Sequence, residues 1–203
     1  MKQKMKIIGL TGGVGSGKSV VAGILKELGA TTMELDKTGH EVLRRKEIRD
    51  RLVSEFGEDI LDSRGEIDRS RLGKKVFSNR DALATLNSIV HPAIDATVIE
   101  KLREYDQQGV KVVILEAAAM LEAGRDWQVD EVWVTVVSEK TVLERLAEAG
   151  RYSREDVKAR IASQISNKER IRQAYVVIDN DGTLDELRDK VKIEWEKLQE
   201  RLK

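Results

Sequence analysis

Gly12-Gly13-Val14-Gly15-Ser16-Gly17-Lys18-Ser19 matches the pattern G-x-x-x-x-G-K-[ST], the sequence signature of a phosphate-binding loop. The stretch follows an apolar run, Ile7 to Thr11, and precedes a segment with helical spacing. In such loops the glycines let backbone N–H groups face phosphate oxygens, and the helix N-terminus adds positive partial charge. We therefore predict that these residues bind the phosphates of ATP or GTP: Gly13, Val14, Gly15, Ser16, Gly17, Lys18, Ser19 and Val20.

The loop also predicts separate roles for its last two residues. A lysine in the position of Lys18 reaches the β- and γ-phosphates and acts in catalysis, and a serine in the position of Ser19 can ligate Mg²⁺. We therefore expect Mg²⁺ as the cofactor, bound together with the nucleotide.

Two acidic residues close apolar runs further along the chain. Asp36 follows Thr31 to Leu35, and Glu116 follows Val112 to Leu115. Ligands of open parallel sheets bind beyond the carboxyl ends of the strands. Asp36 is thus a candidate to orient or deprotonate an attacking hydroxyl, and Glu116 is a candidate to hold the metal through water. The alternative for either residue is a helix cap or a solvated loop acid.

Short runs rich in β-branched residues predict the fold class. They predict five parallel strands in an α/β fold of the P-loop kinase type, flanked by helices. The runs are Ile7 to Thr11, Ala30 to Leu35, Val110 to Leu115, Val129 to Val137 and Tyr175 to Ile178.

The segments between these runs predict one domain with two additions. Helical spacing without strand signal indicates an inserted helical lobe at about 37–108, and a helical stretch at about 145–173 suits a movable lid. The core is then about 1–36, 109–144 and 174–203. Ser153 is a candidate helix cap after Gly150, and Thr183 with Glu186 forms a capping-box signature.

Composition narrows the classes of partner. The 203 residues include 36 basic and 36 acidic side chains and no cysteine. A formal net charge of zero gives no bulk electrostatic reason to expect nucleic acid or an acidic membrane. We expect a cytoplasmic protein with small-molecule partners, present as a monomer or a small homo-oligomer.

The order and spacing of further motifs resemble those of the dephospho-CoA kinase family over essentially the whole chain. The resemblance rests on Ile8 to Ser19, Asp36, Phe56-Gly57, Leu61-Asp62, Leu72-Gly73, Val76-Phe77, His91-Pro92, Ala117 to Gly124, Val177 to Asn180 and Gly182. It implies transfer of the γ-phosphoryl group of ATP to the ribose 3′-hydroxyl of dephospho-CoA, the last step of coenzyme A biosynthesis. It also implies a core sheet, a helical CoA-binding lobe and a lid.

The resemblance assigns roles to particular residues. It places Asp36 where the family has the carboxylate that takes the hydroxyl proton, and Asn180 in a loop near the adenine of ATP. His91 and Glu122 match segments that implicate them in substrate binding. The alternative for His91 is a cap of a helix that begins at Pro92. Asp179 to Gly182, which contains Asn180, is also an ordinary turn sequence.

The lid resembles the family less closely. Arg145 matches the first of two arginines, four residues apart, that clamp the triphosphate and assist catalysis in the family, but the second position is Ala149. Arg151 lies two residues later and could reach the same phosphates. The alternative is that both arginines decorate an exposed helix end.

Departures from the family pattern leave two other functions open. Glu34 and Glu116 stand where the family has aspartate, and Ala118 stands where it has proline. One alternative is a kinase of the same fold that acts on another small hydroxyl compound. The other is a nucleotide-dependent switch or scaffold, although the chain has no obvious N-K-x-D motif for guanine recognition.

Overall fold

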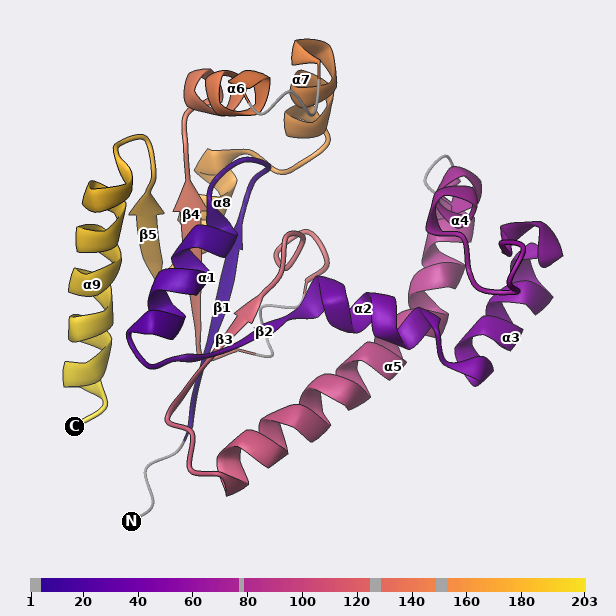
Figure 1. The fold of residues 1–203 in the computed structure, drawn as a ribbon, viewed down its shortest axis with the longest axis horizontal. Coiled ribbons are helices and arrows are strands. Elements are labelled where there is room, and N and C mark those ends of the chain that lie inside the picture. Colours follow the sequence, from indigo (N-terminus) through magenta and orange to yellow (C-terminus); the bar gives the residue numbers. More distant parts are fainter. Residues whose placement is uncertain (1–4, 77–78, 125–128, 149–152) are drawn as a thin grey trace. The chain divides into compact units, whose positions relative to one another are not determined.

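The computed structural model describes residues 5–76, 79–124, 129–148 and 153–203, which divide into two compact units (Figure 1). The first unit comprises Met1–Glu34 with Asp106–Lys203, and the second comprises Leu35–Tyr105.

A parallel sheet forms the centre of the first unit. Within the described residues it contains β1 (Lys6–Gly12), β2 (Thr31–Glu34), β3 (Val112–Glu116), β4 (Glu131–Val136) and β5 (Val176–Asp179). The order is β2-β3-β1-β4-β5, and all neighbouring strands are parallel. The five predicted strands and the α/β class are therefore confirmed.

The central strands β1, β3 and β4 are buried on both faces, as the continuous apolar runs predicted, whereas the edge strands β2 and β5 are partly exposed. On one face, α1 (Lys18–Glu27) and α9 (Leu184–Arg201) pack together, and Trp133 of β4 lies in their core. On the other face, Val132, Val134 and Val136 of the same strand pack with residues beside α8 (Asn167–Gln173). This alternation along β4 follows from the two-residue period of a strand.

Two capping boxes fix helix starts in this unit. Ser153 caps α7 (Arg154–Ala162) together with Asp156, and Thr183 caps α9 together with Glu186. Both predicted caps are confirmed, whereas Gly150 lies outside the described residues. Helix α6 (Glu139–Glu148) also belongs to this unit.

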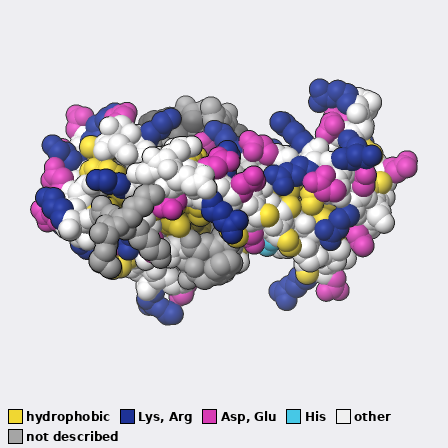
Figure 2. All heavy atoms as spheres, turned by 90° about the horizontal axis from the view of Figure 1, so that it is seen from below, with side chains coloured by type: hydrophobic (Ala, Val, Ile, Leu, Met, Phe, Trp, Pro, Cys, Tyr) yellow, Lys and Arg dark blue, Asp and Glu magenta, His cyan; other side chains and the backbone are white. Residues whose placement is uncertain are grey.

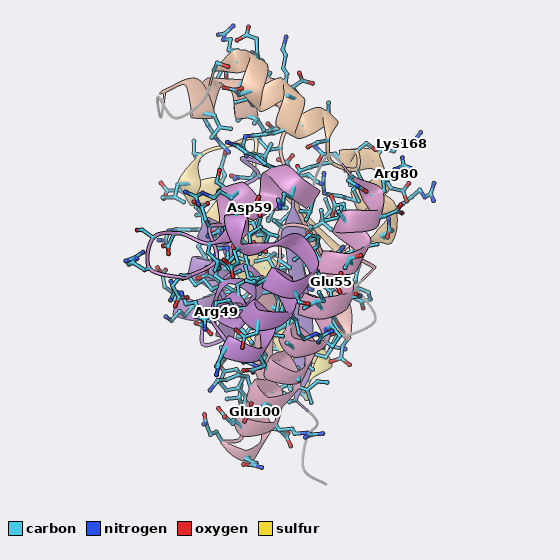
Figure 3. All side chains as sticks on the ribbon, turned by 90° about the vertical axis from the view of Figure 1, so that its right-hand side faces the viewer. Arg49, Glu55, Asp59, Arg80, Glu100 and Lys168 are labelled. Atoms are coloured by element: carbon cyan, nitrogen blue, oxygen red, sulfur yellow. The ribbon has the colours of Figure 1, made fainter. Side chains whose placement is uncertain are left out.

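The second unit is helical. It contains α2 (Leu35–Leu43), α3 (Lys46–Phe56), the 3₁₀ turn η1 (Glu58–Ile60), α4 (Arg69–Val76) and most of α5 (Arg80–Gln107). A hollow of about 200 Å³ lies between residues of α3 and α5, and Glu55 on its wall is labelled in Figure 3.

Helix α5 continues through Pro92, so the interpretation of His91 as the cap of a helix that begins there is wrong. Proline removes one backbone hydrogen bond and disfavours the preceding turn, at a cost of about 3 kcal/mol. Apolar burial on both sides of the proline, by Ile89 and Val90 before it and Ile94 and Val98 after it, opposes this cost.

Length and composition alone would also allow α5 to cross a membrane. Its most apolar 18-residue window has a mean hydropathy of 1.3, and among the described residues no other helix meets this criterion. One such helix is weak evidence for a membrane span, because the core helices of soluble proteins meet the same criterion.

Acidic and basic side chains lie interspersed on the face drawn in Figure 2, in keeping with a net charge of zero.

Candidate active site

The predicted phosphate loop connects β1 to α1. Gly15 and Gly17 have φ values of 71° and 83°, which non-glycine residues rarely adopt. Side chains also exclude a larger residue at two positions: a Cβ on Gly12 would overlap with Thr135 Oγ1, and one on Gly17 would overlap with Asn180 Nδ2. The glycines are therefore required both by the backbone and by close packing beneath the loop.

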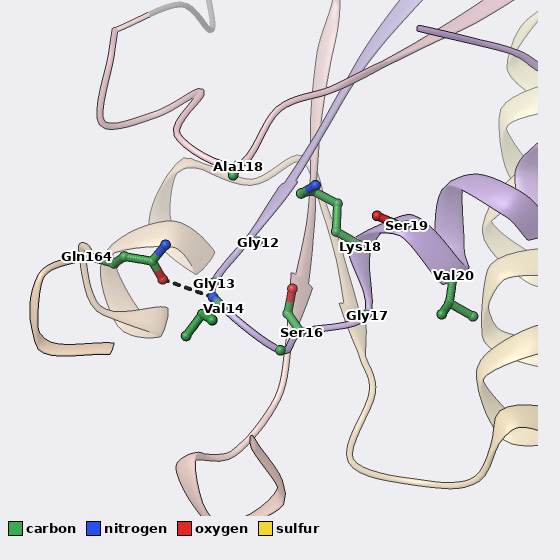
Figure 4. A pocket seen from close by; sticks show the side chains of 11 residues that line it. Gly12, Gly13, Val14, Ser16, Gly17, Lys18, Ser19, Val20, Ala118 and Gln164 are labelled. Atoms are coloured by element: carbon green, nitrogen blue, oxygen red, sulfur yellow. Dashed lines mark hydrogen bonds between the residues drawn. The ribbon is translucent and has the colours of Figure 1, made fainter. Parts of the chain in front are cut away.

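A pocket of about 330 Å³ lies at the loop (Figure 4). It is lined by residues 12–20 together with Ala118 and Gln164. Its walls thus include every residue from Gly13 to Val20 that the sequence predicted to bind nucleotide, although their contact with ATP stays a prediction.

Glu116 binds both functional side chains of the loop. Its Oε1 lies 2.7 Å from Lys18 Nζ and accepts a hydrogen bond of 2.6 Å from Ser19 Oγ. The side chains of Lys18 and Glu116 are only 14% and 6% exposed, so little water reaches this ion pair. The strand-end acid predicted from the sequence therefore lies directly beside the phosphate loop.

The sheet register places a second acidic residue at the level of Glu116. Glu34, the last residue of β2, is the register partner of Glu116 in the parallel β2–β3 ladder. Helix α2 begins at the next residue, and Asp36 is an exposed acid in its first turn. The role of Asp36 as a base stays a prediction.

Residues 180–182, which follow β5, form hydrogen bonds with the phosphate loop and with residues of α6 and its N-terminal flank. Asn180 is buried, and its Nδ2 donates to the carbonyl of Ser16 over 2.9 Å. Arg145 donates to the carbonyl of Gly182 over 3.0 Å. Hydrogen bonds from the Thr141 side chain and the Ser138 backbone hold the pKa of the exposed Asp181 below its usual range. The predicted ATP contacts of Arg145 and Asn180 are untested.

Two further site residues were predicted from the sequence. Arg151 is outside the described residues. His91 lies on α5 in the second unit, one residue before Pro92, and is partly buried.

Arg170 on α8 is a buried cation that the sequence did not reveal. Its side chain is 3% exposed, and it pairs with Glu122 over 2.7 Å. Its second terminal nitrogen donates to the carbonyl of Ile165, whereas Nε is buried without a hydrogen-bond partner. A Cβ on Gly13 would lie 3.2 Å from this guanidinium, so the arginine packs against the phosphate loop. Glu122, predicted to bind substrate, therefore has a structural partner in this unit.

Arg170→Leu is expected to lower the free energy of unfolding by about 3 kcal/mol, because it removes the charged partner of Glu122. Urea denaturation followed by circular dichroism measures this change. Arg172→Leu is the matched control, because Arg172 is 72% exposed on the same helix and should change stability by less than about 1 kcal/mol. Equal losses in the two variants would contradict the assignment of Arg170 to the core.

Thr135, Gln164 and Arg170 are polar residues at the loop that the sequence analysis missed. The hydroxyls of Thr135 and Ser16 lie 2.7 Å apart, and Gln164 Oε1 accepts from the backbone N–H of Val14 over 2.9 Å. These pairs are 119 and 150 residues apart in sequence. No local pattern marks such contacts, since only the folded sheet and the segment before α8 bring the residues together.

Comparisons with known proteins agree with this geometry. A family model described as dephospho-CoA kinase matches residues 6–186. The dephospho-CoA kinase of Dehalococcoides mccartyi is 41% identical over 189 residues, which are 93% of this chain and 96% of that protein.

Two solved structures are similar over nearly their whole length. The protein TT1252 from Thermus thermophilus has a TM-score of 0.84 and 29% identity, with coverage of 96% of this chain and 98% of that one. The dephospho-CoA kinase from Campylobacter jejuni has a TM-score of 0.64 and 25% identity, with coverage of 95% and 97%. With its phosphate loop, its five parallel strands and this match from residue 6 to residue 186, the chain belongs to the dephospho-CoA kinase family.

Proposed function

We propose that the protein transfers the γ-phosphoryl group of ATP to the ribose 3′-hydroxyl of dephospho-CoA, giving CoA and ADP. The observation that carries this proposal is the family match across residues 6–186, which includes the phosphate loop and its acidic partner. The reaction is that of a soluble metabolic enzyme, for which we expect a cytoplasmic location and small-molecule partners.

The proposed reaction forms one P–O bond, breaks another and transfers one proton. The ribose 3′-oxygen attacks the γ-phosphorus, the bond between that phosphorus and the β,γ-bridging oxygen breaks, and ADP leaves with the bonding electrons. We assign the proton of the attacking hydroxyl to Asp36. Lys18 and the backbone N–H groups of the loop stabilise the charge on the phosphates, which supplies most of the rate in such transfers.

The residues beside the loop suit Mg²⁺. This ion prefers oxygen ligands and is usually bound through one or two carboxylates together with substrate phosphates. Ser19 Oγ and the Glu116 carboxylate offer two such oxygens within 2.6 Å of each other. Ser19 and Glu116 would hold the ion when ATP is bound, and the ion would neutralise charge that develops on the phosphates.

The other assignments complete the proposal. Arg145 and Arg151 would contact the triphosphate when the lid, residues 145–173, closes, and Asn180 would contact ATP. The second unit, Leu35–Tyr105, would be the lobe that binds dephospho-CoA, with His91 as a contact there and Glu122 as a further substrate contact.

The test is an ADP-release assay with dephospho-CoA, compared with adenosine, nucleoside monophosphates and shikimate. Dephospho-CoA should stimulate ADP release far more than any of the other acceptors. Stimulation by a different acceptor would instead support a kinase of the same fold with another substrate. No stimulation by any acceptor, with partner binding that depends on ATP or ADP, would support the switch or scaffold.

Glu116→Gln tests the proposed metal site. The substitution keeps the shape of the side chain and removes its charge, so the apparent affinity for Mg²⁺ in the kinase assay should fall about 10- to 100-fold. The control is Glu131→Gln, which changes an equally buried glutamate at the first residue of β4. Glu131 pairs with Lys6 and Arg201, whereas Glu116 contacts Lys18 and Ser19 of the loop. An unchanged Mg²⁺ dependence in Glu116→Gln would contradict the assignment.

A further inference from the structure

The side chain of Gln164 lies at the phosphate loop, although nothing in the sequence marks it as a site residue. It follows α7 and precedes α8, and it is half-buried. Among the described residues, it is one of two outside 12–20 that line the loop pocket. Its Oε1 accepts the backbone N–H of Val14 over 2.9 Å (Figure 4). The lid segment is thus attached to the first turn of the loop.

This hydrogen bond fixes which end of the amide faces the loop. A backbone N–H only donates, so it selects the oxygen of a carboxamide and turns the nitrogen away. In Figure 4 the nitrogen of Gln164 lies on the side away from the bonded oxygen. An amide nitrogen has two N–H donors and no acceptor. Gln164 therefore presents donors at the wall of a pocket whose other groups, Lys18 and the loop backbone, also suit an anion.

The segment that carries Gln164 is held on both sides. Its backbone N–H donates to Ile161 O at the end of α7, and the carbonyl of the next residue, Ile165, accepts from Arg170. Arg170 is in turn fixed by its ion pair with Glu122. Arg170 is therefore a positioning residue that acts through Gln164, and its buried side chain limits the freedom that Gln164 would lose on contact with a ligand.

The loop side of the contact is also anchored. Val14 packs against an apolar cluster formed by Val137, Val142 and Val157, with Leu146 and Ile161 beside it. This cluster ties the loop to α6 and α7, so that Val14 and Gln164 are held by the same group of elements. The arrangement is preorganised, which is what a site that stabilises phosphate charge requires.

We propose that Gln164 is a nucleotide-contacting residue whose side-chain nitrogen donates a hydrogen bond to a phosphate oxygen of ATP, while its oxygen stays on Val14. This inference rests on the proposed kinase function for the identity of the nucleotide. It differs from two simpler roles. In one, Gln164 only holds Val14 in place. In the other, it is a plug that occupies the N–H of Val14 until phosphate displaces it.

Two substitutions separate these roles by the rank order of their effects on MgATP binding, measured by titration calorimetry without acceptor. Gln164→Leu removes the donor and the acceptor. It should weaken binding about tenfold, which is the usual loss of affinity when one hydrogen bond to a charged group is removed. Gln164→Glu keeps an acceptor for Val14 but presents a carboxylate oxygen to the phosphates, and should weaken binding about a hundredfold. Under our proposal the glutamate variant is therefore the weaker binder.

The matched controls are Gln173→Leu and Gln173→Glu, since Gln173 is an exposed glutamine on α8 that bonds Glu169. Both should bind MgATP within about twofold of the unmodified protein. Thermal unfolding checks that each variant is folded. If Gln164→Leu does not fold, the binding constant of Gln164→Glu decides the test, because glutamate keeps the shape of the glutamine side chain.

The other rank orders would overturn the proposal. If Gln164→Glu binds like the unmodified protein and Gln164→Leu binds weakly, Gln164 only holds Val14. If Gln164→Leu binds MgATP more tightly, Gln164 is a plug, and if neither variant changes binding, it makes no contact. Failure of the proposed kinase function has a different signature, because absent turnover with dephospho-CoA would leave these binding constants unchanged.

Discussion

Lys18→Met is expected to lower kcat/KM for MgATP by a factor of about 1,000. The reason is that removing one preorganised donor to developing charge costs on the order of 10²–10³ in rate, and Lys18 carries a full charge. Its Nζ lies at the loop pocket and is already held 2.7 Å from Glu116, so the ammonium group is positioned before nucleotide binds. The ADP-release assay with dephospho-CoA measures the loss.

The control must separate this loss of activity from a loss of stability. In Lys18→Met the largely buried Glu116 keeps Ser19 as a donor but loses its charged partner, which is expected to cost about 3 kcal/mol of unfolding free energy. The double variant Lys18→Met/Glu116→Gln removes the unpaired charge, and should recover stability while staying inactive. Lys26→Met removes an exposed lysine from the same helix and should remain fully active. A double variant with normal activity would exclude Lys18 from phosphate binding.

The parts of the site that could be predicted from the sequence are those that depend on residues adjacent in the chain. The loop from Gly12 to Ser19 is contiguous, and the apolar run before Glu116 identified the acid that ends β3. Asp36, expected at the end of a strand, lies in α2 instead, because β2 ends at Glu34. In the sheet, Glu34 and Glu116 share one register position. Local patterns were sufficient for these features because parallel strands align their carboxyl ends.

The parts that could not be predicted depend on distant pairs and on competition between energies. Gln164 and Val14 are 150 residues apart, and the partner of Arg170 lies 48 residues away. In an amphipathic or loop segment, either residue looks like a solvated polar side chain, the usual state of glutamine and arginine. Pro92 was misjudged for the second reason, since α5 tolerates a proline between two buried apolar pairs.

Asp36→Asn is expected to lower kcat about a thousandfold, within the 10²–10⁴ range typical of a positioned general base. Asparagine keeps the size and hydrogen-bonding shape of the side chain but cannot accept the hydroxyl proton under assay conditions. The KM for dephospho-CoA should change little, because the interaction lost is one made chiefly in the transition state. Rapid-quench measurement of CoA formation reports the chemical step directly.

The competing role for Asp36 is a structural one, as an acid in the first turn of α2. Such a residue stabilises a helix by about 0.3–1 kcal/mol through the helix dipole, and its loss would change stability slightly and leave the rate intact. Glu41→Gln makes the same carboxylate-to-amide change at an exposed position of the same helix and should leave kcat unchanged. If Asp36→Asn behaves like Glu41→Gln in the rapid-quench assay, Asp36 serves the helix alone and the proton must be taken by another group.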